Sequence, residues 1–138
     1  MTATENLYYA LGEIAYAVAK ADGRIQKDEV QKFHGILEAE LQVPSDSFSV
    51  ADIIFHIMNK DHVDAETAYE NGMHQMRLYS HHLTPEMKLS FLHVTEKVAH
   101  AFPPRLRSEE NMITRFRADI AQLRSDNLFC KTKNDGVQ

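Results

Sequence analysis

Two amphipathic segments near the start of the chain are joined by the stretch 19-AKADGRIQKDE-29. In the segment before it, apolar residues recur every three or four positions, which is the period of a helix with one buried face. These residues are Leu7, Leu11, Ile14 and Val18, and the same period continues after the stretch at Val30, Phe33, Leu37 and Leu41. Gly23 can take the left-handed conformation that ends many helices. The stretch therefore predicts two helices joined by a tight acidic turn.

The helical period continues through the rest of the chain, and no segment shows the alternation of a strand. The six predicted helices span residues 4–21, 26–41, 50–59, 64–82, 85–101 and 108–124. Thr4 or Asn6 is the expected cap of the first helix, and Thr84 that of the fifth. The third helix is predicted to turn these residues inward: Ile53, Ile54, Ile57 and Met58. The fold class is an all-α, single-domain bundle of about six to seven helices, the seventh being a short one in the tail.

The first and fifth helices share a pattern of apolar positions. Leu7 corresponds to Met87 and Val18 to Val98 at a constant shift, but the agreement is lost in the helices that follow. Two interpretations stay open, namely two pseudo-repeated helix hairpins or a chance match between two amphipathic helices.

The acidic turn fits the second half of a calcium-binding EF-hand loop. With Gly23 as the sixth position, Asp22 is the fifth and Glu29 the twelfth, but Val18 and Lys20 stand where two carboxylates are needed. The order Ala-Lys-Ala-Asp-Gly, then an apolar residue and Glu29, resembles the TerB-like tellurite-resistance family of small all-helical proteins. The resemblance implies a helical fold, a role in metal or oxyanion stress, and cation binding that would carry over to Asp22, Gly23 and Glu29.

Two interpretations of the acidic turn stay open. Asp22, Asp28 and Glu29 would repel one another unless a cation compensates, and oxygen ligands suit Ca²⁺ or Mg²⁺. Alternatively, Asp22 supports the turn, while Asp28 and Glu29 stabilise the positive end of the second helix.

A polar-aromatic stripe runs along the first helix beside its apolar face, and consists of Tyr9, Glu13, Tyr16 and Lys20. A buried Glu13 would need a hydrogen-bond donor, so the stripe is a candidate ligand cleft. The alternative is a boundary face on which long side chains reach to solvent.

Eight histidines are present, and several lie on the fourth and fifth helices. If these helices form a hairpin, His74 and His93 are level with each other and could hold zinc. Neither helix has a histidine pair at chelating spacing, so solvated or capping histidines are the alternative.

Length, composition and charge indicate the number of domains, the classes of partner and the localisation. The chain has 138 residues, of which 43% are hydrophobic, enough for one core. We expect one domain over residues 1–124 and a frayed tail over 125–138. The net charge of −5, with basic and acidic residues mixed, argues against nucleic-acid binding. Cys130 is the single cysteine, and neither a signal peptide nor a spanning segment is visible, so we expect a cytoplasmic protein without direct membrane insertion.

The sequence supports a non-catalytic module more than an enzyme, because it lacks a Gly-x-Ser-x-Gly turn and a glycine-rich phosphate loop. By its resemblance, the module would serve in tellurite or metal stress, with weak divalent-cation binding and with protein partners, one of which could be a membrane protein. The alternatives are a protein–protein interaction module without metal and a metal-dependent hydrolase.

Overall fold

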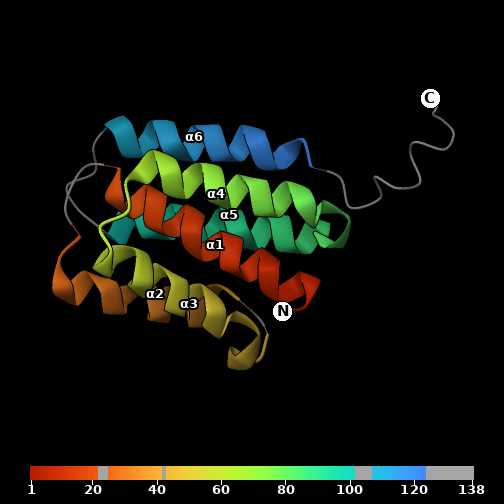
Figure 1. Ribbon diagram of the computed structural model, residues 1–138, viewed down its shortest axis with the longest axis horizontal. Helices are drawn as coiled ribbons and strands as arrows, with labels where there is room; N and C mark the ends of the chain where they lie inside the picture. The colour runs from red at the N-terminus through yellow and green to blue at the C-terminus, as the bar shows by residue number, and fades with distance from the viewer. Residues whose placement is uncertain (22–24, 42, 102–106, 124–138) are drawn as a thin grey trace, which may run out of the picture.

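The computed structural model describes residues 1–21, 25–41, 43–101 and 107–123, and these form a single helical bundle without strands (Figure 1). The six α-helices are α1 (Ala3–Lys20), α2 (Lys27–Glu40), α3 (Ser45–Lys60), α4 (Ala65–Leu78), α5 (Pro85–Ala101) and α6 (Arg107–Ala121). A 3₁₀ turn, η1 (Ser80–His82), follows α4. The all-α prediction is confirmed. The expected division at residue 124 and the tail lie outside the described residues.

Side-chain caps fix the start of α1 and α5. The Thr2 hydroxyl accepts a hydrogen bond of 3.1 Å from the Glu5 amide, and the Glu5 carboxylate accepts one of 2.8 Å from the Thr2 amide. This reciprocal capping box replaces the predicted caps, Thr4 and Asn6, which lie inside the helix. The predicted cap of α5 is confirmed, since Thr84 accepts a hydrogen bond of 3.1 Å from the Met87 amide.

The start of α3 and half of its inner face differ from the prediction, whereas Ile54 and Met58 are buried as predicted. The helix begins at Ser45 rather than near residue 50, because Pro44 has a φ of −58°, which is compatible with a helix entrance. Ile53 and Ile57, predicted to point inward, are 57% and 46% exposed. Ala51 and Phe55 are fully buried instead. The helix is therefore rotated so that Ala51, Ile54 and Phe55 face the core, and Ala51 and Ile54 meet Gly12 of α1.

The prediction for residues 64–82 was one long helix, but α4 ends at Leu78 and η1 continues the chain. Tyr79 lies between them with a φ of −112°, outside the helical region. His81 and His82 belong to η1 and are exposed.

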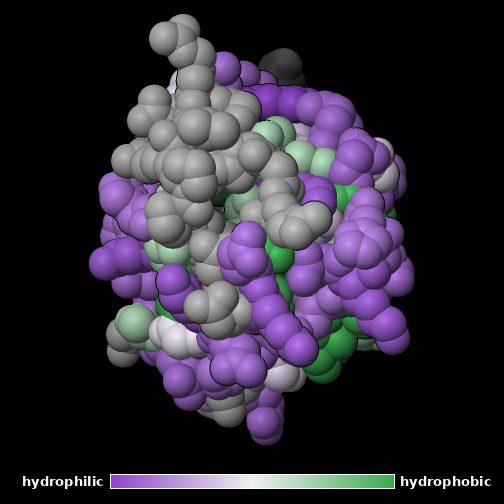
Figure 2. All heavy atoms as spheres, turned by 90° about the vertical axis from the view of Figure 1, so that its left-hand side faces the viewer, coloured by the Kyte–Doolittle hydropathy of each residue, from purple (hydrophilic) through white to green (hydrophobic). Residues whose placement is uncertain are grey.

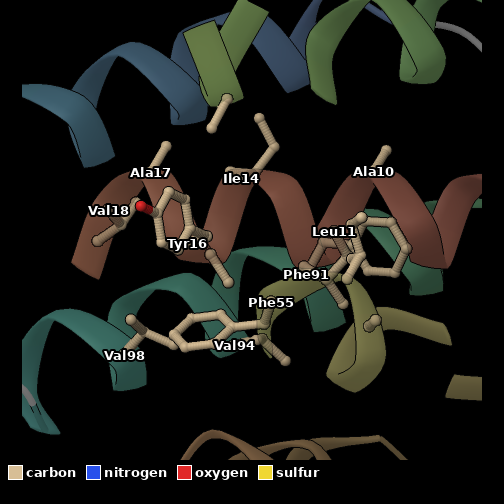
Figure 3. Close-up of a cluster of buried hydrophobic side chains, with 14 of the residues drawn as sticks. Ala10, Leu11, Ile14, Tyr16, Ala17, Val18, Phe55, Phe91, Val94 and Val98 are labelled. Atoms are coloured by element: carbon tan, nitrogen blue, oxygen red, sulfur yellow. The ribbon is translucent and has the colours of Figure 1, made fainter. Parts of the chain in front are cut away.

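The centre of the bundle is α1, which packs on α3, α4, α5 and α6 (Figure 1). Ala10, Ile14 and Ala17 point toward α4, whereas Leu11 and Val18 point toward α5 (Figure 3). Helices α1, α2 and α5 share one core, since a single buried cluster contains Val18, Ile25, Phe33, Phe91, Val94 and Val98.

Two glycines allow α1 to approach its neighbours closely. A Cβ atom at Gly12 would lie 2.5 Å from the Ala51 carbonyl oxygen of α3. A Cβ atom at Gly72 of α4 would lie 2.7 Å from Ile14 Cδ1. Gly72 thus permits close packing of α4 on α1, and Gly12 permits close packing of α3 on another side of α1.

The two candidate hairpins are packed differently. α2 packs on α3 and α5, whereas α6 packs on α5 and α1. The α2–α5 and α6–α1 contacts correspond to each other if the hairpins are exchanged, so the pseudo-repeat stays a prediction.

Candidate functional site

Three directions around α1 are occupied by other helices. Gly12 faces α3, Ile14 faces α4, and Leu11 faces α5 (Figure 3). Successive residues of an α-helix are rotated by about 100°, so the fourth direction belongs to Glu13. Figure 1 shows no helix of the described ranges lying over α1 between α3 and α4. The polar-aromatic stripe therefore lies on a side of α1 over which none of the described helices runs, and its Glu13 and Tyr16 side chains are nevertheless buried.

The structure places the four residues of the stripe at different depths. Glu13 is 4% exposed, and Tyr16 is fully buried. Tyr9 is partly buried and packs against the core, while Lys20, in the last turn of α1, is also partly buried. Glu13 and Tyr16 thus form the inner part of the stripe, flanked by Tyr9 and Lys20.

Glu13 is the buried acid of this side. Its Oε1 atom is buried and has no hydrogen-bond partner among the described residues. Burial raises the pKa of the Glu13 carboxyl from its ordinary 4.5 to about 7, because the ionised form loses its hydration. Burial, and then the charge of Glu13, raise the pKa of Tyr9, which places the phenol near the carboxylate. A buried Glu13 was expected to need a hydrogen-bond donor, and none of the described residues donates to its Oε1 atom.

A strained turn closes one end of this side. The Tyr16 hydroxyl donates a hydrogen bond of 2.6 Å to the Val63 carbonyl oxygen. The C-terminal turn of α3 holds Val63 in place, because the Val63 amide donates a hydrogen bond of 3.1 Å to the Met58 carbonyl oxygen. In the same turn, His62 has a φ of 56°. A left-handed residue at this position ends many helices, although it is usually glycine. The hydroxyl hydrogen of Tyr16 is therefore already used in a hydrogen bond to the backbone.

Sequence analysis missed one group of polar side chains, which lies between α2 and α3. His34 Nδ1 lies 2.9 Å from Asp52 Oδ2, and His56 Nε2 lies 3.4 Å from Asp52 Oδ1. His34 Nε2 also lies 3.5 Å from Glu38 Oε2. The available signal was the spacing of four residues within each helix, but only the packing of α2 on α3 joins the two pairs.

A pocket of about 380 Å³ opens beside α5 and is lined by His93, Glu96, Lys97 and His100. Glu40 of α2 lies 3.9 Å from His93 Nδ1 and 3.8 Å from Lys97 Nζ. A ligand in this pocket would compete with those ion pairs. His74, the other histidine of the predicted zinc pair, is exposed on α4.

A metal site needs several ligating side chains at one place, and this can be judged for the part of the chain that the structure describes. There, no three histidine, cysteine, aspartate or glutamate side chains are grouped so that they could hold a metal ion. Asp22 lies outside the described residues, as do the side chains of Asp28 and Glu29, so the predicted calcium or magnesium site stays a prediction. Figure 2 shows the end of the bundle where α1 and α5 finish and α2 begins, and its described surface is mostly hydrophilic.

A model of a known protein family, described as tellurite resistance protein TerB, matches residues 9–126. The chain belongs to the TerB family. This TerB domain is thereby related to tellurite resistance, and the match includes the acidic turn and the whole polar-aromatic stripe. Comparisons with curated proteins and with solved structures gave no match. Over its described residues, the TerB domain has no helix that is both long and apolar enough to cross a bilayer.

Proposed function

We propose that this TerB domain is a non-catalytic binding module whose ligand occupies the polar-aromatic stripe of α1. The observation that supports it is the Glu13 Oε1 atom, which is buried without a partner among the described residues, on the side of α1 over which none of the described helices runs. A buried polar atom without a hydrogen bond costs roughly 1–3 kcal/mol. Such a cost is common where a ligand supplies the missing partner, and perturbed acids cluster at such sites.

The neighbours of Glu13 favour binding over catalysis. Tyr16 is committed to Val63, and Tyr9 has a raised pKa, so neither phenol is prepared to act as a base at neutral pH. General acid–base and nucleophilic mechanisms place a second activated group within hydrogen-bond reach of the first. Among the described side chains, no histidine, cysteine or second carboxylate makes a hydrogen bond or an ion pair with Glu13.

The test is a fragment screen followed by amide chemical shifts of the ¹⁵N-labelled protein. The screen contains cationic, neutral and anionic fragments. We expect the binding fragments to shift the amides of Tyr9, Glu13 and Lys20 together and saturably. The proposal is wrong if no fragment moves these amides, or if the bound fragments cluster at the α5 pocket instead.

A second candidate function is weak binding of Ca²⁺ or Mg²⁺ by the acidic turn. It is favoured by the position of Asp28 and Glu29 in the first turn of α2, directly after the connection that contains Asp22. Calorimetric titration with calcium, magnesium, manganese and zinc tests it. We expect millimolar affinity for Ca²⁺ or Mg²⁺ that Glu29→Gln abolishes, and no heat of binding in the wild type would count against the site.

We further propose that the domain acts with protein partners, including a membrane protein, as the resemblance to the tellurite-resistance family suggests. Exposed apolar side chains support a role in protein contacts, and on α3 these are Ile53 and Ile57. Co-purification with a tagged domain, compared with its Ile53→Ser, Ile57→Ser variant, tests this role: a partner lost only by the variant supports it, and an unchanged set of partners opposes it.

A further inference from the structure

We propose that the ligand of the polar-aromatic stripe is an organic cation, a primary ammonium or guanidinium group that pairs with Glu13 and displaces its proton. The inference rests on the function proposed above, and it adds the chemical class of the ligand. Three observations support it: the charged groups around Glu13, the oxygen groups that the stripe offers to a ligand, and the apolar side chains of α3 beside it.

Within the described ranges, no basic side chain forms an ion pair with Glu13. On α3, Asp52 and His56 are turned toward α2, where Asp52 pairs with His34. On α1 itself, Lys20 is seven residues further along, which is about 10 Å of helix and too far for an ion pair in this helical geometry.

The acidic groups at the start of α4 bind residues other than Glu13. Glu66 and Glu70 bind Arg115 of α6 at 2.8 Å and 2.5 Å. Asp64, just before α4, accepts hydrogen bonds from Thr67; burial, and then the charge of Asp64, raise the pKa of Tyr16. A cation that enters from solvent would therefore be the first partner of opposite charge for this carboxylate.

The groups at the stripe suit an organic cation better than a metal ion. Calcium takes six to eight oxygen ligands and magnesium needs near-octahedral geometry. Here one carboxylate stands beside phenols, and the described residues hold no group of three metal-ligating side chains. An ammonium or guanidinium group needs only one carboxylate, and it is also attracted to the face of a tyrosine ring such as that of Tyr9.

The walls of this side match the alkyl stem that such a cation carries. Ile54 of α3 lies against Gly12, next to Glu13 in the chain, and is buried. Ile57, three residues further along α3 and so on nearly the same flank, is 46% exposed. An alkyl chain leaving the carboxylate toward solvent would cover this exposed isoleucine.

Binding of a cation must be linked to pH. Burial holds the pKa of Glu13 at about 7, so the free protein carries a proton there at pH 6 and has lost it at pH 8. The cation pairs only with the carboxylate, and the displaced proton passes to water. The affinity should therefore rise about tenfold between pH 6 and pH 8, as the ionised fraction does.

The experiment follows amide shifts of the ¹⁵N-labelled full chain with n-butylammonium and n-butylguanidinium, and with n-butanol and butyrate as neutral and anionic controls. We expect the cations to shift Tyr9, Glu13 and Tyr16 saturably, with affinity about tenfold tighter at pH 8 than at pH 6. Glu13→Gln should abolish the shifts, while Glu38→Gln, which removes one exposed carboxylate of α2, should retain them. Circular dichroism confirms that both variants are folded.

Capped lysine and arginine, with both backbone ends blocked, distinguish the two sources of the cation. If they bind as the butyl compounds do, the ligand is a side chain of a protein partner; if only the butyl compounds bind, it is a free amine or guanidine. Cation shifts that persist in Glu13→Gln would overturn the inference. If only butanol or butyrate moves these amides, the inference fails and the proposed binding function stands; if no compound moves them, both fail.

Discussion

The hydroxyl of Tyr69 on α4 donates a hydrogen bond of 2.6 Å to Oδ2 of Asp119 on α6. The Arg115 guanidinium carbon lies 4.1 Å from the centre of the same tyrosine ring. Arg115 also makes two hydrogen bonds of 2.8 Å to Glu66. These contacts join α4 to α6 by polar groups, beside the apolar contact that α6 makes with α5.

Tyr69→Phe removes only the hydroxyl of this link. Tyr69 is 1% exposed, so the hydrogen bond to a carboxylate is largely shielded from water. We expect the free energy of unfolding to fall by about 1–2 kcal/mol in chemical denaturation. Tyr79→Phe serves as control, because Tyr79 is partly buried and its hydroxyl makes no hydrogen bond with the part of the chain that the structure describes. Equal losses in the two variants would show that the bond to Asp119 contributes nothing.

Replacing Gly12 or Gly35 by alanine should change the stability of the protein in opposite directions. At Gly12 an added Cβ would lie 2.5 Å from the Ala51 carbonyl oxygen, so Gly12→Ala should force α3 away from α1 and lower stability by about 1–3 kcal/mol. At Gly35 of α2 an added Cβ meets nothing within 4 Å. Gly35→Ala should therefore raise stability by about 0.5–1 kcal/mol through helix propensity. Thermal and urea denaturation measure both, and a stabilising Gly12→Ala would contradict the close approach of α1 and α3.

Phe91 and Leu89 test the core of α5. Phe91 is fully buried, and its ring centre lies 5.6 Å from that of Tyr8. Phe91→Ala should lower the free energy of unfolding by about 3–5 kcal/mol, through lost burial and the cavity that remains. Leu89 is 57% exposed on the same helix, so Leu89→Ala should change stability by less than about 0.5 kcal/mol. If Phe91→Ala lowers the free energy of unfolding by less than about 1 kcal/mol, the assignment of Phe91 to the core is wrong.

His62 stores strain at the end of α3. Its φ of 56° is costly for a residue with a side chain and is free for glycine. His62→Gly should raise stability by up to about 1 kcal/mol, because relief of the strain outweighs the entropy that glycine gains in the unfolded chain. His62→Val should lower it, since a β-branched residue resists this conformation. The order Gly, His, Val from most to least stable is the expected result, and a destabilising glycine would mean that the histidine ring contributes contacts.

Glu13 predicts a characteristic dependence of stability on pH. The folded pKa of about 7 lies above the ordinary 4.5, so between these values the folded protein holds a proton that the unfolded chain has released. The stabilisation of the folded state by the protonated Glu13 carboxyl is therefore fully present below pH ~4.5 and is lost as the pH rises through ~7. Glu13→Gln stays uncharged, so the wild type should lose up to ~3 kcal/mol relative to this variant between pH 4.5 and pH 7.

Urea denaturation of the wild type and of Glu13→Gln at closely spaced pH values measures this difference directly. Subtraction of the two curves removes the titration of the histidines, which both proteins share. A constant difference across the range would mean that the Glu13 carboxyl is hydrated in the folded protein.

The sequence by itself determined the helices and most of their inner faces. Capping and periodicity are local, so Thr84 marked the start of α5, and Phe91 and Val94 marked its buried face. The same local signals identified the polar-aromatic stripe and the acidic turn as candidate sites.

Only the tertiary structure decided which polar groups of these helices meet or are left unpartnered. Ile53 and Ile57 have the right spacing for a core, yet α3 meets α1 through Ala51 against Gly12, which leaves both isoleucines outside. Glu13 is buried because α3 and α4 flank α1 on either side of it, and His34 meets Asp52 because α2 packs on α3. Periodicity gives the direction of a side chain around its own helix, but the neighbouring helix that it meets depends on contacts between residues far apart in the chain.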